Sequence, residues 1–111
     1  MGRLVIASDF SLITGGRLIK EGDFSGELFR DKVLEPKYRE CMEHGEKLEI
    51  IFDGCYGIGS GFLDEAFGGM VRKYGYLDLL DHIILIAEED KTIPAQIFRY
   101  VKAAVAVATA E

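Results

Sequence analysis

The sequence predicts an α/β fold in which helices pack on a central sheet of parallel or mixed strands. Short runs of β-branched and other apolar residues alternate along the chain with longer segments whose apolar residues recur every three or four positions. The first pattern is typical of buried strands and the second of amphipathic helices. Because strands that alternate with helices form β-α-β units, we expect the strands to lie side by side in one sheet.

Length and composition fit one domain that spans residues 1–111. The chain is 49% hydrophobic, which supplies enough apolar material for a packed core. Its net charge of -6 repels phosphate backbones and anionic lipid, so we expect neither a nucleic acid nor a membrane as partner. The two cysteines and the N-terminal residues match no zinc-site, disulfide-framework, export or lipid-anchor pattern, which predicts a cytoplasmic protein without a metal or other cofactor.

The first third of the chain is expected to contain a strand, a turn and the start of a helix. Residues 4–7 form a short apolar run, and a glycine pair then marks a turn. Residues 17–20 are compatible with a second short strand. Asp23 or Ser25 is placed to cap the helix that follows, because a short side-chain oxygen accepts a hydrogen bond from the free amides of a first helical turn.

Residues 26–45 predict an amphipathic helix that a proline interrupts. Pro36 lacks an amide hydrogen and clashes with the carbonyl four residues earlier. We therefore expect two helical segments that meet near Glu35, or a kink. Gly45 is expected to end the helix, with His44 in its last turn.

Residues 48–52 are the strongest predicted strand, and their apolar character on both faces indicates a central position in the sheet. A glycine-rich turn leads into a helix over residues 62–74, which Gly75 is expected to end. Gly68 and Gly69 lie within this helix, where glycine is costly, so we expect close backbone packing against them.

The last third predicts one more strand and one more helix. Residues 82–87 form the strand, and an acidic turn follows, after which Thr92 is expected to cap the helix. The helix has an apolar stripe that consists of Ile97, Phe98, Val101, Ala104, Val105 and Ala108. Its alanine-rich end packs weakly on a core, so we expect it to contact a partner or to form a homodimer.

The glycine-rich turn before the second helix is the first candidate site. It contains Gly57, Gly59 and Gly61. A turn that opens a helix presents free amides and the positive end of the helix dipole, which bind anions. Phe62 replaces the third glycine of the dinucleotide fingerprint. Asp64 and Glu65, which are themselves candidates for contact with a partner, oppose a bound phosphate. A small-molecule or nucleotide site over residues 57–61 is therefore one hypothesis for this turn.

Ser60, within that turn, has two interpretations. It is either the cap of the helix or an exposed hydroxyl that acts as a nucleophile or as the substrate of a kinase. The residues around it do not fit the nucleophile elbow of hydrolases, and His44 and His82 are both expected to be structural. No catalytic residue can be assigned, so the sequence predicts a protein that is not an enzyme.

Three arginines are further candidates for contact with an anion or with a protein partner: Arg17, Arg30 and Arg72. A guanidinium binds a phosphate or a carboxylate through two parallel hydrogen bonds. The other interpretation is an ion pair within the chain, for which Glu21, Glu27 and Asp64 are the expected acids.

Two segments of the chain resemble the STAS-like domain family of prokaryotic proteins. The first, residues 16–30, contains Ser-Gly-Glu-x-Phe-Arg, and the second, residues 53–69, contains Phe-Leu-Asp-Glu-x-Phe-Gly-Gly. This family is in turn similar to anti-sigma-factor antagonists. In those proteins the central strand ends in an Asp-Ser-Ser-Gly turn that opens a helix, and a partner kinase phosphorylates the first serine.

The resemblance implies a single STAS-like domain that regulates a protein partner. Gly59 corresponds to the aspartate of the antagonist turn, Ser60 to the phosphorylated serine, and Gly61 to the second serine. The implied partner is an ATPase of the histidine-kinase-like class, which contacts the Ser60 turn and the helix after it. The implied regulation is phosphorylation of Ser60.

Overall fold

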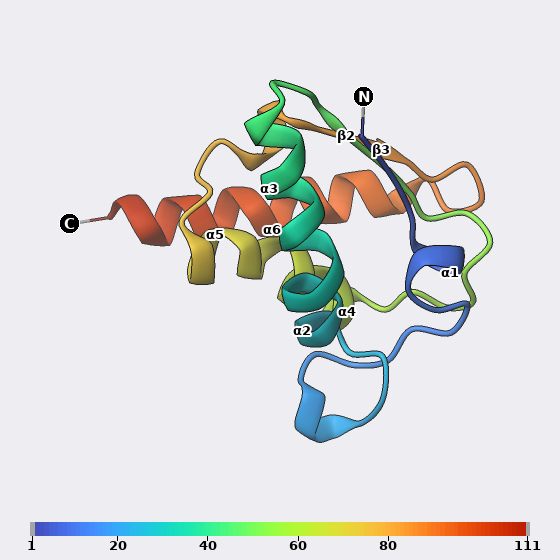
Figure 1. Ribbon diagram of the computed structural model, residues 1–111. Coiled ribbons are helices and arrows are strands. Elements are labelled where there is room, and N and C mark those ends of the chain that lie inside the picture. The colour runs from blue at the N-terminus through green and yellow to red at the C-terminus, as the bar shows by residue number, and fades with distance from the viewer. Residues whose placement is uncertain (1, 111) are drawn as a thin grey trace.

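A three-stranded parallel sheet forms the centre of the computed structural model, which describes residues 2–110 (Figure 1). The strands are β1 (Gly2–Val5), β2 (Leu48–Ile51) and β3 (Ile83–Ile86), in the order β1-β2-β3. Leu4 lies opposite Ile50, which in turn lies opposite Leu85. The predicted α/β class and the central position of the second strand are confirmed.

The long helices lie on one side of this sheet (Figure 1). On β2, the buried residues Leu48 and Ile50 alternate with Glu49 and Ile51, which are half-buried. Side chains alternate between the two faces of a strand, so the first pair faces the helices and the second pair the other side. The sheet therefore contributes one face to the core.

Two early expectations are wrong. The first strand ends at Val5, and residues Ile6–Asp9 form the short helix α1, whose Asp9 carboxylate accepts a hydrogen bond from the Val5 amide at 2.8 Å. Residues 17–20 form no strand and lead into the 3₁₀ turn η1 (Ile19–Glu21). The amides of residues 18 and 19 donate to carboxylates of Glu21 and Glu27, so they are not available for a sheet.

The first long helix runs without a break through three segments. These are α2 (Gly26–Phe29), the π-helical turn η2 (Arg30–Leu34) and α3 (Glu35–Glu43). Ser25 caps the helix by accepting a hydrogen bond from the Leu28 amide at 3.0 Å. The wide turn ends at Leu34, and the amide of Glu35, the residue before Pro36, donates to the carbonyl of Arg30, five residues earlier. The expected junction near Glu35 is thus a π turn, and Gly45, with φ 65°, follows the helix end.

The second long helix is built in the same way. It consists of α4 (Ser60–Leu63), the π-helical turn η3 (Asp64–Gly68) and α5 (Gly69–Tyr74), and Gly75 follows it in the left-handed region. A β-carbon on Gly69 would overlap the guanidinium of Arg30, and one on Gly68 would lie 2.7 Å from Nη1 of Arg72. The expected approach of another backbone is thus not what the structure shows: the glycine pair makes room for arginine side chains.

The chain then passes through the 3₁₀ turn η4 (Leu79–Asp81) and β3 to the 18-residue helix α6 (Thr92–Thr109). The cap position of α6 is Lys91, so the expectation that Thr92 caps the helix is wrong. Thr92 is the first helical residue, and the Asp90 carboxylate accepts hydrogen bonds from its amide at 3.0 Å and its hydroxyl at 2.6 Å. Within the predicted stripe, Ile97, Val101 and Ala104 are buried. Phe98 and Ala108 are exposed, which differs from the expectation. Phe98 lies between the buried Ile97 and Val101 and therefore points away from the core, whereas Ala108 lies beyond Ala104, the last buried residue of α6.

Aromatic side chains fill the space between the two long helices and the sheet. Phe67 is fully buried, with its ring centroid 6.5 Å from that of Phe29 and 5.9 Å from that of Phe52. Phe29 is also 5.5 Å from Phe62. This core fixes the helix that begins at Ser60 against the end of β2.

Candidate functional site

The turn between β2 and α4 is anchored to the turn between β3 and α6. The carboxylate of Asp53 accepts hydrogen bonds from the amides of Glu88, at 3.2 Å, and Glu89, at 2.8 Å. In return, the Glu89 carboxylate accepts a hydrogen bond from the Gly54 amide at 2.6 Å. Gly54 and Gly57 have φ values of 95° and 58°, which favour glycine. The backbone that leads to Ser60 is therefore held at its start.

Ser60 is the first residue of α4 and is exposed. Gly59, in an extended conformation, occupies the cap position, so the capping interpretation of Ser60 is wrong by one residue. The Ser60 hydroxyl makes no hydrogen bond to any residue from 2 to 110. The hydroxyl is thus at an exposed position without a partner among the described residues.

Arg17 lies across the start of the same helix. A β-carbon on Gly61 would be 3.1 Å from Cγ and 3.3 Å from Nε of Arg17. The guanidinium donates to Asp64 at 2.6 Å, and this hydrogen bond raises the pKa of Arg17. Arg72 donates to the same carboxylate at 3.2 Å and to the Asp64 carbonyl at 2.9 Å. The structure thus brings three of the candidate residues together as a cluster within the chain, close to Ser60.

Arg30 and Glu65 form a second, separate cluster. Arg30 is 4% exposed and donates to the Glu65 carboxylate at 2.5 Å, to the Glu65 carbonyl at 3.0 Å and to Asp31 at 2.9 Å. Asp31 also accepts hydrogen bonds from Lys73 and Tyr74, each at 2.9 Å. These contacts connect the π turns of the two long helices, so Arg30 holds the helices together.

Three exposed apolar side chains on the segments that precede α4 form a surface that was not predicted from the sequence. Leu12, Ile13 and Tyr56 expose 54%, 64% and 71% of their surface. They are neighbours, because the Tyr56 amide donates to the Leu12 carbonyl at 2.8 Å and Tyr56 forms a bridge with Ile13. The one signal in the sequence was the apolar pair 12–13 within a loop. We call these three residues and Ser60 the turn surface.

A comparison with protein-family models finds a match over residues 25–92, to the family described as STAS-like domain of unknown function (DUF4325). The chain belongs to this STAS-like family. The matched residues include both long helices, β2, β3 and the Ser60 turn. No curated protein and no solved structure matches the chain.

Two structural features are absent from the described part of this STAS-like domain. Residues 2–110 contain no helix that is both long and apolar enough to cross a membrane. The same residues contain no group of three or more His, Cys, Asp or Glu side chains that could hold a metal ion.

Asp31 gives the STAS-like domain a pH-dependent stability. Burial opposes ionisation of Asp31, but hydrogen bonds from Arg30, Lys73 and Tyr74 outweigh burial and hold its pKa well below the usual range. As the pH falls, Asp31 is therefore protonated in the unfolded chain before it is protonated in the folded domain. The stabilisation that the Asp31 carboxylate provides above about pH 4 is lost on acidification. We expect Asp31→Asn to unfold at a lower temperature than the native chain at pH 7 and to lose less stability between pH 5 and pH 3, as measured by thermal denaturation. Parallel pH profiles for the two chains would contradict this assignment.

Proposed function

We propose that this STAS-like domain is a regulatory, non-enzymatic protein-binding module of the anti-sigma-factor-antagonist type, with the turn surface as its contact. One observation carries the proposal. An exposed serine hydroxyl without an intramolecular partner in the described residues opens a helix four residues after the exposed Tyr56, which pairs with the exposed segment Leu12–Ile13. Contiguous exposed apolar residues mark sites of protein interaction, and we place Ser60 at the edge of that contact, where a phosphate would control it.

The expected partner is an ATPase of the histidine-kinase-like class that also phosphorylates Ser60. A phosphate adds a charge of about -1.5 to -2 at neutral pH. Within the domain, the start of a helix tolerates this charge, since the positive end of the helix dipole lies there. Within a complex, the phosphate loses its water against the apolar residues of the turn surface, which is costly. Phosphorylation therefore releases the partner without unfolding the domain.

The alternative, an anion site for a small molecule or nucleotide over residues 57–61, remains a separate hypothesis. Arg17 is the cation beside this turn, and Asp64 already holds its guanidinium. An incoming anion has to compete with that ion pair. A thermal-shift screen with nucleotides separates the two functions, because a ligand at a hundred times its dissociation constant stabilises the folded state by about 2.7 kcal/mol.

Replacing Ser60 tests the regulatory proposal. We expect Ser60→Asp to keep the free energy of unfolding within about 1 kcal/mol of the native value, but to bind the co-purified partner more weakly in titration calorimetry. Ser60→Ala should bind with native affinity and accept no phosphate from the partner. Ala95→Asp, which adds the same charge at an exposed position of α6, is the matched control and should bind normally.

Equal affinities for the native and Ser60→Asp chains would refute the switch. Tyr56→Ser then asks whether the turn surface binds the partner at all. We expect this variant to fold normally, because Tyr56 is 71% exposed, and to lose affinity.

A further inference from the structure

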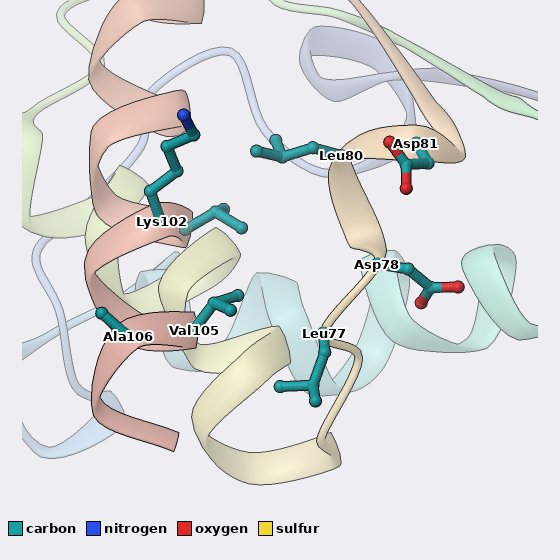
Figure 2. A pocket seen from close by; sticks show the side chains of 8 residues that line it. Leu77, Asp78, Leu80, Asp81, Lys102, Val105 and Ala106 are labelled. Carbon is teal, nitrogen blue, oxygen red and sulfur yellow. The ribbon is translucent and has the colours of Figure 1, made fainter. Parts of the chain in front are cut away.

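The second half of α6 and residues 77–81 form the two walls of an apolar groove (Figure 2). Leu77, Leu80 and Val105 point into the gap, which has a volume of about 400 Å³. The volume is within the range of ligand sites, and its lining is mostly apolar. None of these residues belongs to the turn surface, so the groove is independent of the proposed function.

The two walls of the groove carry opposite charges. Helix α6 contains no acidic residue, and its two basic residues, Arg99 and Lys102, contact aromatic rings of their own helix. Neither forms an ion pair within residues 2–110. On the other wall, Asp78 pairs with His82, and Asp81 is exposed, with a carboxylate that has no partner in the described residues. Lys102 and Asp81 are thus a cation and an anion on one face, and neither has an ion-pair partner within the described residues.

The same face includes an uncharged helix end. The last turns of α6 extend past the other helices, and residues 103–110 contain no charged side chain (Figure 1). Ala103, Ala106 and Ala110 are exposed there. Small side chains allow another helix to approach closely, and exposed apolar surface favours its burial.

We propose that a second copy of this chain occupies the groove, with α6 of each copy packed on the groove of the other. A contact across a two-fold axis uses the same surface twice, so that surface must complement itself. This face does so: it combines an apolar helix that bears Lys102 with an apolar wall that bears Asp81. Lys102 of each copy then lies near Asp81 of the other.

Any other occupant would pair with only some of the charges of this face or cover only part of its apolar surface. A foreign basic helix pairs with Asp81 but leaves Lys102 without a carboxylate, and a small molecule in the groove leaves residues 103–110 in water. The contact involves one helix and one short segment per copy, which is at the low end of specific interfaces. We therefore expect a dissociation constant that is roughly micromolar.

Sedimentation velocity over a concentration series tests the dimer. The native chain should associate, and Ala106→Glu should weaken association by about tenfold or more, the factor that corresponds to 1.4 kcal/mol. Ala95→Glu makes the same substitution at an exposed position of α6 outside the groove, and should change association less than about twofold. A native chain that stays monomeric at every concentration overturns the proposal, as does equal weakening by Ala95→Glu.

A mixing experiment tests the charge pair itself. Lys102→Glu alone places two acids opposite each other, and Asp81→Lys alone places two lysines opposite each other, so each variant should be monomeric. In an equimolar mixture, the introduced glutamate of one variant would face the introduced lysine of the other, while native Lys102 faces native Asp81. Association should then return to within about threefold of native. Circular dichroism confirms that both variants are folded. A mixture that remains monomeric overturns the proposal.

Discussion

Arg30→Ala is expected to lower the free energy of unfolding by about 2 to 4 kcal/mol. Arg30 is buried and is the common partner of Asp31 and Glu65, which belong to the two long helices. Its removal leaves both carboxylates without their main cation in a largely dry environment. They keep 19% of their side-chain surface exposed, so we place the loss below the upper limit for a fully buried pair. Chemical denaturation measures the change.

Two further variants separate charge from packing in this result. Arg30→Met keeps most of the side-chain volume beside Gly69, so a loss nearly as large as that of Arg30→Ala identifies the charge as the cause. Lys91→Ala is the surface control: this lysine lies 3.5 Å from Glu88, both side chains are more than 70% exposed, and exposed pairs contribute about 0 to 1 kcal/mol. Equal losses for Arg30→Ala and Lys91→Ala would show that the buried cluster does not stabilise the domain.

The pH dependence of Arg30→Ala provides a readout that a lost packing contact does not change. Arg30 is one of the groups that hold the pKa of Asp31 low. Without it, Asp31 binds a proton at a higher pH and loses its unfavourable charge. The stability difference between Arg30→Ala and the native chain should therefore shrink between pH 5 and pH 3, whereas a difference caused by packing alone would stay constant.

Elements whose apolar residues recur with the period of a strand or a helix could be predicted from the sequence. The strand at residues 48–51 and the helix ends at Gly45 and Gly75 depend on local residue types, and the structure confirms them. Residues 17–20 could not be predicted, because side chains of Glu21 and Glu27 take the amides that a strand would pair. A hydrogen bond from Ile19 to a side chain eight residues away leaves no periodic signal.

The candidate site was predictable in part. Its position at the end of β2 follows from the glycine-rich turn and the helix after it. The role of each residue depends on contacts between distant parts of the chain. Asp64 forms an ion pair with Arg17, which lies 47 positions earlier. Arg30 is buried, whereas one expectation was that it contacts a partner at the surface. The exposure of Leu12 and Tyr56 could not be predicted, since an apolar residue in a loop has the same sequence pattern whether it is covered or not.

Phe67→Ala is expected to lower the free energy of unfolding by about 3 to 5 kcal/mol, the range for truncation of a buried aromatic residue. Phe67 is fully buried between Phe29 of the first long helix and Phe52 at the end of β2, so the truncation leaves a cavity in the centre of the core. Both neighbours are held by other contacts, and collapse around the cavity should be limited. Phe98→Ala, on a ring that is 49% exposed, is the control and should cost less than about 1 kcal/mol. Urea denaturation at low protein concentration measures both, and a Phe67→Ala chain as stable as Phe98→Ala would place the second long helix outside the core, together with the Ser60 turn that it begins.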